Sequence, residues 1–351
     1  MRLRHKSATH GSSSGPETAK VARLGDFMRA VTAVLLALAL LAVPVALASP
    51  PKRVSATAAG PDLSSTENVL RWINGYRTHG NVERMPEVVQ AMSRLGVFRD
   101  LETAGIYIGF MAGVLQTNPD KAEKLVTRMF PMPPEDQVAI VRAIAYSELP
   151  DWKDLMLKFA ERMPARKALI DRFVYGKMPT LRQLELDSGP GPLDMLWGMY
   201  FATGSYEPIL RMVSILAWAK DVNNVERLTI GSMTKLSLAT NASRDKELLD
   251  MLKVSMAVET KDTRVVLQEV IDAAETFEFG KVRKDAMASI DQLKVKGPAS
   301  ARNVQWWGQA GQTALALGCI VAGVLGQFQV GIPCVIGGAV SGAAIKYMTP
   351  Q

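Results

Sequence analysis

The fold class is decided by residues 119–179, PDKAEKLVTRMFPMPPEDQVAIVRAIAYSELPDWKDLMLKFAERMPARKALIDRFVYGKMP, in a chain of 351 residues. Prolines recur along this stretch at spacings of 15, 16, 14 and 15 residues. They are Pro119, Pro134, Pro150, Pro164 and Pro179. Proline is tolerated in the first turn of a helix and disfavoured further inside it. Each interval between prolines therefore predicts one short helix followed by a turn.

The residues between the prolines support this interpretation. In DWKDLMLKFAERM, large side chains fall at spacings of three and four residues, at Trp152, Leu155, Met156 and Phe159, which is typical of an amphipathic helix. Acidic residues follow several of the prolines, as Asp120 follows Pro119, where negative charge stabilises the start of a helix. Two consecutive units form a helical hairpin of about thirty residues.

Helical patterns continue beyond the proline stretch. Leu193, Leu196, Trp197, Tyr200 and Phe201 form a stripe that should end at Gly204, and Ser205 should cap the next helix. Asn74-Gly75 is a dipeptide found in hairpin turns, but no alternating runs flank it, so we expect a turn or a helix end there. We predict an all-α protein with a helical-repeat domain over residues 66–297.

This succession of short helices resembles the tetratricopeptide-like and related α-solenoids, in which stacked helical hairpins bury one continuous core. The resemblance covers about residues 66–296 and is architectural, since the tetratricopeptide consensus cannot be placed on any unit. It implies a body whose exposed face binds another protein.

The N-terminal 48 residues have the three parts of a secretory signal. Arg29 precedes a charge-free apolar run, Ala30–Ala48, and Ala46-Leu47-Ala48 provides the small residues that a signal peptidase accepts. We expect cleavage between Ala48 and Ser49, export to a bacterial periplasm or cell envelope, and a flexible linker over residues 49–65. The alternative is an uncleaved membrane anchor, since nineteen residues nearly span a bilayer.

Residues 298–351 form a glycine-rich apolar segment, with no charged residue between Arg302 and Lys346. Its two halves, about residues 309–326 and 330–345, predict a hairpin of two helices, each about 24 to 27 Å long. The hairpin would be inserted in a membrane or associated with one, and the alternative is a buried hairpin that caps the solenoid. The residues that would anchor it at the interface or pack its helices are Trp306, Trp307, Gly338, Gly342, Lys346 and Tyr347.

The chain has two cysteines, Cys319 and Cys334, which a turn at about residues 327–329 would bring close together. We predict that they are neighbours across the hairpin and could form a disulfide, while their redox state stays open. With His79 as the one histidine outside the leader, the chain lacks the residues of a His/Cys zinc site. We expect no metal and no cofactor.

The net charge of +7 does not indicate nucleic-acid binding. Residues 1–30 hold six basic and two acidic residues, so the rest of the chain has 35 basic against 32 acidic residues. A nucleic-acid binder needs a basic surface to neutralise phosphates, and this balance provides little excess charge for one.

Two patterns in the body could carry other functions. Ser232-Met233-Thr234-Lys235 matches the S-x-x-K motif of serine hydrolases of the β-lactamase type, but the partner motifs of those enzymes are absent from the sequence. The alternative is a serine and a surface lysine on an ordinary helix, with no catalytic role. Trp197, Tyr200, Phe201 and Tyr206 could line a peptide-binding groove, although their helical spacing favours the core.

The sequence thus favours a non-enzymatic, exported and envelope-associated scaffold or adaptor that binds another protein. One alternative is a membrane-active protein that inserts and oligomerises through the C-terminal hairpin. Another is a hydrolase that uses Ser232 and Lys235.

The export hypothesis predicts where the mature chain begins. N-terminal sequencing of the protein purified from an envelope fraction should give Ser49 as the first residue, because Ala46-Leu47-Ala48 follows the apolar core of the signal. An intact Met1 or Met28 in a membrane fraction would instead identify the leader as an anchor.

Overall fold

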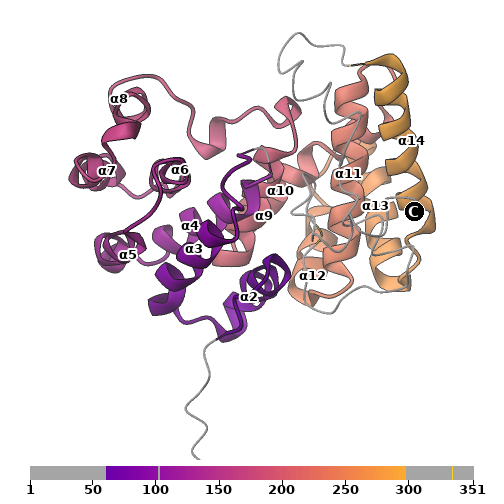
Figure 1. Ribbon diagram of the computed structural model, residues 1–351. Helices are drawn as coiled ribbons and strands as arrows, with labels where there is room; N and C mark the ends of the chain where they lie inside the picture. Colours follow the sequence, from indigo (N-terminus) through magenta and orange to yellow (C-terminus); the bar gives the residue numbers. More distant parts are fainter. Residues whose placement is uncertain (1–60, 102, 298–333, 335–351) are drawn as a thin grey trace, which may run out of the picture. The chain divides into compact units, whose positions relative to one another are not determined.

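The computed structural model of the chain describes residues 61–101, 103–297 and 334. Within these residues the chain forms thirteen α-helices and no strand, which confirms the all-α prediction (Figure 1). The succession of helices is compatible with a helical-repeat architecture. The predicted leader, residues 1–48, lies outside the described residues, as does most of the linker.

The helices are short, and several are preceded by a single 3₁₀ turn. The α-helices are α2 (Thr66–His79), α3 (Met85–Arg94), α4 (Gly105–Gln116), α5 (Ala122–Met129), α6 (Gln137–Tyr146), α7 (Trp152–Ala160), α8 (Lys167–Val174), α9 (Gly191–Thr203), α10 (Tyr206–Ser214), α11 (Val225–Ala242), α12 (Lys246–Ser255), α13 (Lys261–Thr276) and α14 (Gly280–Lys296). The 3₁₀ helices are η2 (Val82–Arg84), η3 (Pro119–Lys121), η4 (Pro164–Arg166), η5 (Leu181–Gln183), η6 (Leu186–Ser188) and η7 (Leu216–Lys220).

The regularly spaced prolines lie in the turns that precede the helices and not inside an α-helix. Pro119 and Pro164 open η3 and η4, which lead directly into α5 and α8. Pro134 and Pro150 lie in turns just before α6 and α7. Pro179 differs, because the next element is the 3₁₀ helix η5. A residue without an N–H fits these turns, since the first N–H groups of a helix have no partner within it.

Helices of two kinds build the core. Outer helices such as α5 bury one face, and its buried residues Leu125, Val126 and Met129 lie at the spacing of one helical stripe. In contrast, α4 is buried along Gly105–Leu115 and has no charged residue. A helix that is apolar on all sides belongs in the interior, so α4 is expected to be surrounded by other helices.

The neighbour of α4 along its length is α9, and glycines set the distance between them. A Cβ atom added at Gly109 would lie 1.9 Å from the carbonyl oxygen of Met195. A Cβ atom added at Gly198 would lie 2.1 Å from the carbonyl oxygen of Ile106. No side chain can be accommodated at either position without moving a helix backbone, so the two helices are in backbone contact at these glycines.

The end of α9 and the start of α10 lie where the sequence predicted them. Gly204 ends α9 in the left-handed conformation, with φ of 68°, and the Ser205 side chain accepts a hydrogen bond from the backbone N–H of Glu207. Trp197, Tyr200 and Phe201 are buried. The core interpretation is therefore confirmed for these three residues. It is wrong for Tyr206, which is 58% exposed in the first turn of α10.

The prediction of a turn or helix end at Asn74-Gly75 is wrong. Both residues lie inside α2, which Ser65 caps and which continues to His79. The rings of Trp72 and Tyr76 lie on either side of this dipeptide in the sequence, and both pack against Phe110 of α4. These tertiary contacts outweigh the local preference of the dipeptide for a turn.

Candidate functional site

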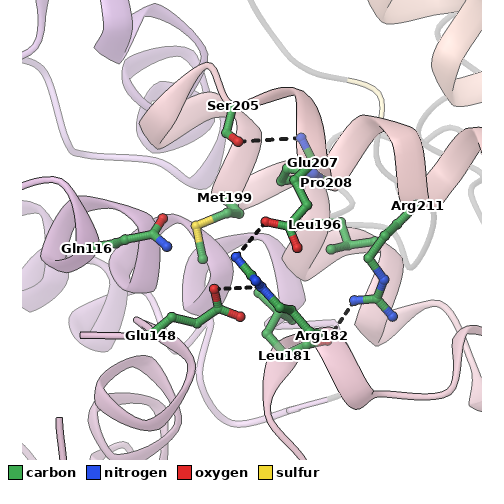
Figure 2. A pocket seen from close by; sticks show the side chains of 10 residues that line it. All are labelled: Gln116, Glu148, Leu181, Arg182, Leu196, Met199, Ser205, Glu207, Pro208 and Arg211. Carbon is green, nitrogen blue, oxygen red and sulfur yellow. Dashed lines mark hydrogen bonds and ion pairs between the residues drawn. The ribbon is translucent and has the colours of Figure 1, made fainter. Parts of the chain in front are cut away.

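A small pocket with charged walls lies where the end of α4, the segment between α6 and α7, η5, α9 and the start of α10 come together (Figure 2). Its volume is about 170 Å³. The residues that line it are Gln116, Glu148, Leu181, Arg182, Leu196, Met199, Ser205, Glu207, Pro208 and Arg211. Water occupies about 30 Å³ per molecule in the liquid, so this volume is on the scale of one amino-acid side chain.

The apolar floor of the pocket comes from the interior of the protein. Leu196 and Met199 belong to α9 and are 2% and 4% exposed, and Leu181 of η5 is 3% exposed. Because α9 is in backbone contact with α4, the side chains of Leu196 and Met199 stand on a rigid support. The floor should therefore keep its shape when the pocket is filled.

Glu148 forms one wall and has an unusual backbone conformation. Its φ is +56°, in the left-handed region that residues other than glycine, asparagine and aspartate seldom adopt. The Nε atom of Arg182 lies 2.9 Å from a carboxylate oxygen of Glu148. Burial raises the pKa of the Glu148 carboxyl above its ordinary value, and the charge of Arg182 opposes that rise. Backbone strain in a residue of this kind is a recurrent feature of binding sites.

Arg182 bridges two carboxylates across the mouth of the pocket. Beside its contact with Glu148, its Nη2 atom lies 2.9 Å from a carboxylate oxygen of Glu207 (Figure 2). The Arg182 side chain is 59% exposed, while that of Glu148 is 19% exposed. Arg182 thus contacts two carboxylates at once while remaining accessible to solvent.

Arg211, on α10, is the second cation of the pocket and has a different environment. Its Nη1 atom donates to the carbonyl oxygen of Leu181 at 2.7 Å, and its Nη2 atom donates to that of Leu184 at 2.9 Å. Burial lowers the pKa of this guanidinium, while Glu207 and Glu148 act in the opposite direction. Within the described part of the chain, no carboxylate oxygen lies within ion-pair distance of Arg211. A half-buried guanidinium that donates to carbonyl oxygens and has no carboxylate within ion-pair distance can bind an additional anion.

The S-x-x-K pair lies elsewhere, on α11, and both of its side chains are buried. Ser232 is 1% exposed, and the Lys235 side chain is 4% exposed. The Lys235 ammonium forms ion pairs with Glu269 of α13 and, at 2.9 Å, with Asp285 of α14. A general base must offer a lone pair to the serine hydroxyl, whereas this amine donates to two carboxylates. The arrangement is that of a buried lysine that joins three helices.

Most of the residues predicted for the C-terminal hairpin and the signal cleavage site lie outside the described residues. They are Trp306, Trp307, Gly338, Gly342, Lys346, Tyr347, Cys319, Ala48 and Ser49. Cys334 is described; it is 5% exposed and lies in neither a helix nor a strand. At this residue the predicted helix over 330–345 is wrong.

Two properties of the described residues concern membrane-spanning helices and metal sites. None of the helices described is long and apolar enough to span a bilayer. No group of three or more His, Cys, Asp or Glu side chains within residues 61–101, 103–297 and 334 could hold a metal ion.

The chain was compared with protein-family models, with curated proteins and with solved structures, and none of the three comparisons gave a match.

The pocket was not predicted from the sequence. Glu148, Arg182 and Arg211 follow one another at intervals of about thirty residues and belong to no motif. Ser147-Glu148-Leu149-Pro150 gives no sign of a positive φ, since glycine and asparagine are the usual signals for it. The one usable signal was Ser205, whose predicted cap position marks the start of the helix that contributes Arg211.

The raised pKa of Glu148 predicts a pH-dependent effect of Glu148→Gln. Since the pKa is higher in the folded than in the unfolded protein, the folded state binds more protons, and ionisation of Glu148 lowers stability as the pH rises above about 4.5. Glutamine removes this titration, so the stability of the variant relative to the wild type should be greater at pH 7 than at pH 4. The free energy of unfolding, measured with urea at both pH values, tests this.

Glu161→Gln is the matched control, because Glu161 is exposed and its side chain forms no hydrogen bond or ion pair with another described residue. It measures what the loss of an exposed carboxylate does at each pH, and the Glu148→Gln difference is read against it. A difference for Glu148→Gln that is equal at pH 4 and pH 7 would show that folding does not shift the pKa of Glu148, and a greater difference at pH 4 would show that folding lowers it. Either result would contradict the raised pKa.

Proposed function

We propose that this chain is a non-enzymatic, exported and envelope-associated scaffold or adaptor that binds another protein, and that an acidic side chain of this partner enters the pocket. The observation that carries the proposal is Arg211, a half-buried guanidinium in the pocket wall that donates to two backbone carbonyl oxygens. A third, negatively charged acceptor would complete its environment.

The pocket suits a single side chain better than a free metabolite. Its volume of about 170 Å³ is below the range of roughly 300 to 1,000 Å³ that is usual for small-molecule sites. Its floor is apolar, at Leu196 and Met199, and its walls are charged. A glutamate or aspartate would place its methylene groups on the floor and its carboxylate against Arg211, as an anchor residue does in a protein interface.

The charges at the mouth would favour such a partner. The formal charges of Arg182 and Arg211 together equal those of Glu148 and Glu207, so an incoming acid meets no net negative charge in the pocket. The exposed Arg182 could also turn toward the ligand, because its side chain remains largely in solvent.

The location is proposed on the sequence alone. A basic residue, a charge-free apolar run and Ala46-Leu47-Ala48 are the parts of an export signal, so the partner is expected in the envelope.

A membrane-active protein is the second candidate, and a different observation favours it. The sequence between Arg302 and Lys346 has no charged residue and is rich in glycine, a composition found in closely packed membrane helices that form oligomers. Leakage of a dye from liposomes made of phosphatidylethanolamine and phosphatidylglycerol would support this candidate. Partner binding without leakage would support the adaptor.

The adaptor proposal is tested with a photo-crosslinking residue at the pocket. Benzoylphenylalanine at Gln116, in the wall of the pocket, should crosslink one partner in envelope fractions, and mass spectrometry should find the crosslinked peptide to contain Asp or Glu. Arg211→Met should weaken this crosslink by about tenfold or more, since hydrogen bonds to charged groups contribute about 1.5 to 3 kcal/mol. Arg211→Lys, which keeps the charge, should have a smaller effect.

Benzoylphenylalanine at Val258 is the control, because this side chain is 81% exposed and does not line the pocket. It should not give the same crosslinked peptide. If Arg211→Met leaves the pocket crosslink unchanged, or if the peptide lacks an acidic residue, the pocket does not bind the partner in the way proposed.

A further inference from the structure

The side chain of Asn241 forms two hydrogen bonds with the backbone of one distant residue. Its Nδ2 atom donates to the carbonyl oxygen of Cys334 at 2.8 Å, and its Oδ1 atom accepts from the backbone N–H of Cys334 at 2.9 Å. The two residues are 93 positions apart in the sequence. Asn241 is 8% exposed and Cys334 is 5% exposed, so both bonds are shielded from water.

This geometry identifies what Asn241 binds. A carboxamide that pairs with both the N–H and the C=O of the same residue replaces the backbone partner that a neighbouring strand would supply. Such a contact fits a locally extended backbone, because a residue inside a helix uses its N–H and C=O for bonds along the helix. Cys334 is accordingly in neither a helix nor a strand.

Burial makes the contact stronger. Cys334 packs among the buried apolar residues of the core, where a backbone N–H or C=O without a partner costs about 1 to 3 kcal/mol. Asn241 satisfies both groups from the last turn of α11. The engaged and buried amide of Asn241 also leaves the sequon Asn241-Ala242-Ser243 without an accessible acceptor.

We propose that Asn241 is a docking site on the helical body for the C-terminal segment of the same chain, which binds there through the backbone at Cys334. In this docked state residue 334 is not part of a helix that spans a membrane. The proposal does not depend on the pocket or on the function assigned to it.

The test is hydrogen–deuterium exchange of the full chain, measured by mass spectrometry on peptides that cover residues 328–340. Asn241→Asp keeps the size of the side chain but places an oxygen against the carbonyl of Cys334, so exchange should become at least about tenfold faster. Asn223→Asp is the matched control, because Asn223 is exposed and its side chain forms no hydrogen bond to another described residue. It should exchange like the wild type.

Two substitutions in the C-terminal segment test the contact from the other side without changing the helical body. Cys334→Pro removes the donor N–H and should exchange faster than Cys334→Ala, which keeps the test valid if Asn241→Asp unfolds α11. Cys334→Ala is its matched control, because both substitutions remove the disulfide in which Cys334 takes part and only proline also removes the backbone N–H. Exchange that is unchanged in Asn241→Asp, or equal in Cys334→Pro and Cys334→Ala, would overturn the proposal.

A second arm of the experiment adds vesicles of phosphatidylethanolamine and phosphatidylglycerol. If docking protects residue 334, the difference between the wild type and Asn241→Asp should persist in their presence. Equal protection of both proteins with vesicles and without them would mean that something other than Asn241 holds the segment, and would also overturn the proposal.

Discussion

The fold depends on the backbone contact between α4 and α9 at Gly109 and Gly198. A Cβ atom at either glycine would lie about 2 Å from a carbonyl oxygen of the other helix. The two helices can therefore pack at this separation only because both positions are glycine. Other elements are built on this pair. Helix α6 packs on α4, and α2 and α10 pack on α9 (Figure 1). Helix α9 contributes Leu196 and Met199 to the floor of the pocket, and the end of α4 contributes Gln116 to its wall. The proposed binding site is therefore built on the two helices that the glycine contact holds together.

Helix α11 supplies a second constraint of a different kind. It is buried on nearly every side, although it contains several polar residues, and these join it to its surroundings. Ser237 accepts a hydrogen bond from Trp197 of α9, Lys235 pairs with carboxylates of α13 and α14, and Asn241 binds Cys334. A buried polar group without its partner is costly, so each of these contacts selects one arrangement of the neighbouring elements. The S-x-x-K pattern belongs to this set of buried contacts.

Much of the local structure could be predicted from the sequence, because helix-capping and helix-breaking residues and the periodicity of apolar residues act over short distances. The prolines mark helix starts, and Gly204 with Ser205 marks the junction of α9 and α10. Long-range contacts were missed. Gly105, Gly109 and Gly113 recur at intervals of four residues, a pattern that permits close helix packing, yet the sequence does not name α9 as the partner. The pocket was missed for the same reason, since its charged residues meet only in the folded chain, and the positive φ of Glu148 arises from tertiary contacts that no local pattern encodes.

The most direct test of this glycine-dependent core is the free energy of unfolding of Gly109→Ala, measured with denaturant beside Gly75→Ala. Gly75 lies inside α2 with no atom within 4 Å of an added Cβ, so alanine there should raise stability by about 0.5 to 1 kcal/mol through helix propensity alone. At Gly109 the same methyl group meets the carbonyl oxygen of Met195 at 1.9 Å, and stability should fall by about 2 kcal/mol or more. Equal effects of the two substitutions, or a Gly109→Ala protein as stable as the wild type, would contradict a core set by backbone contact between α4 and α9.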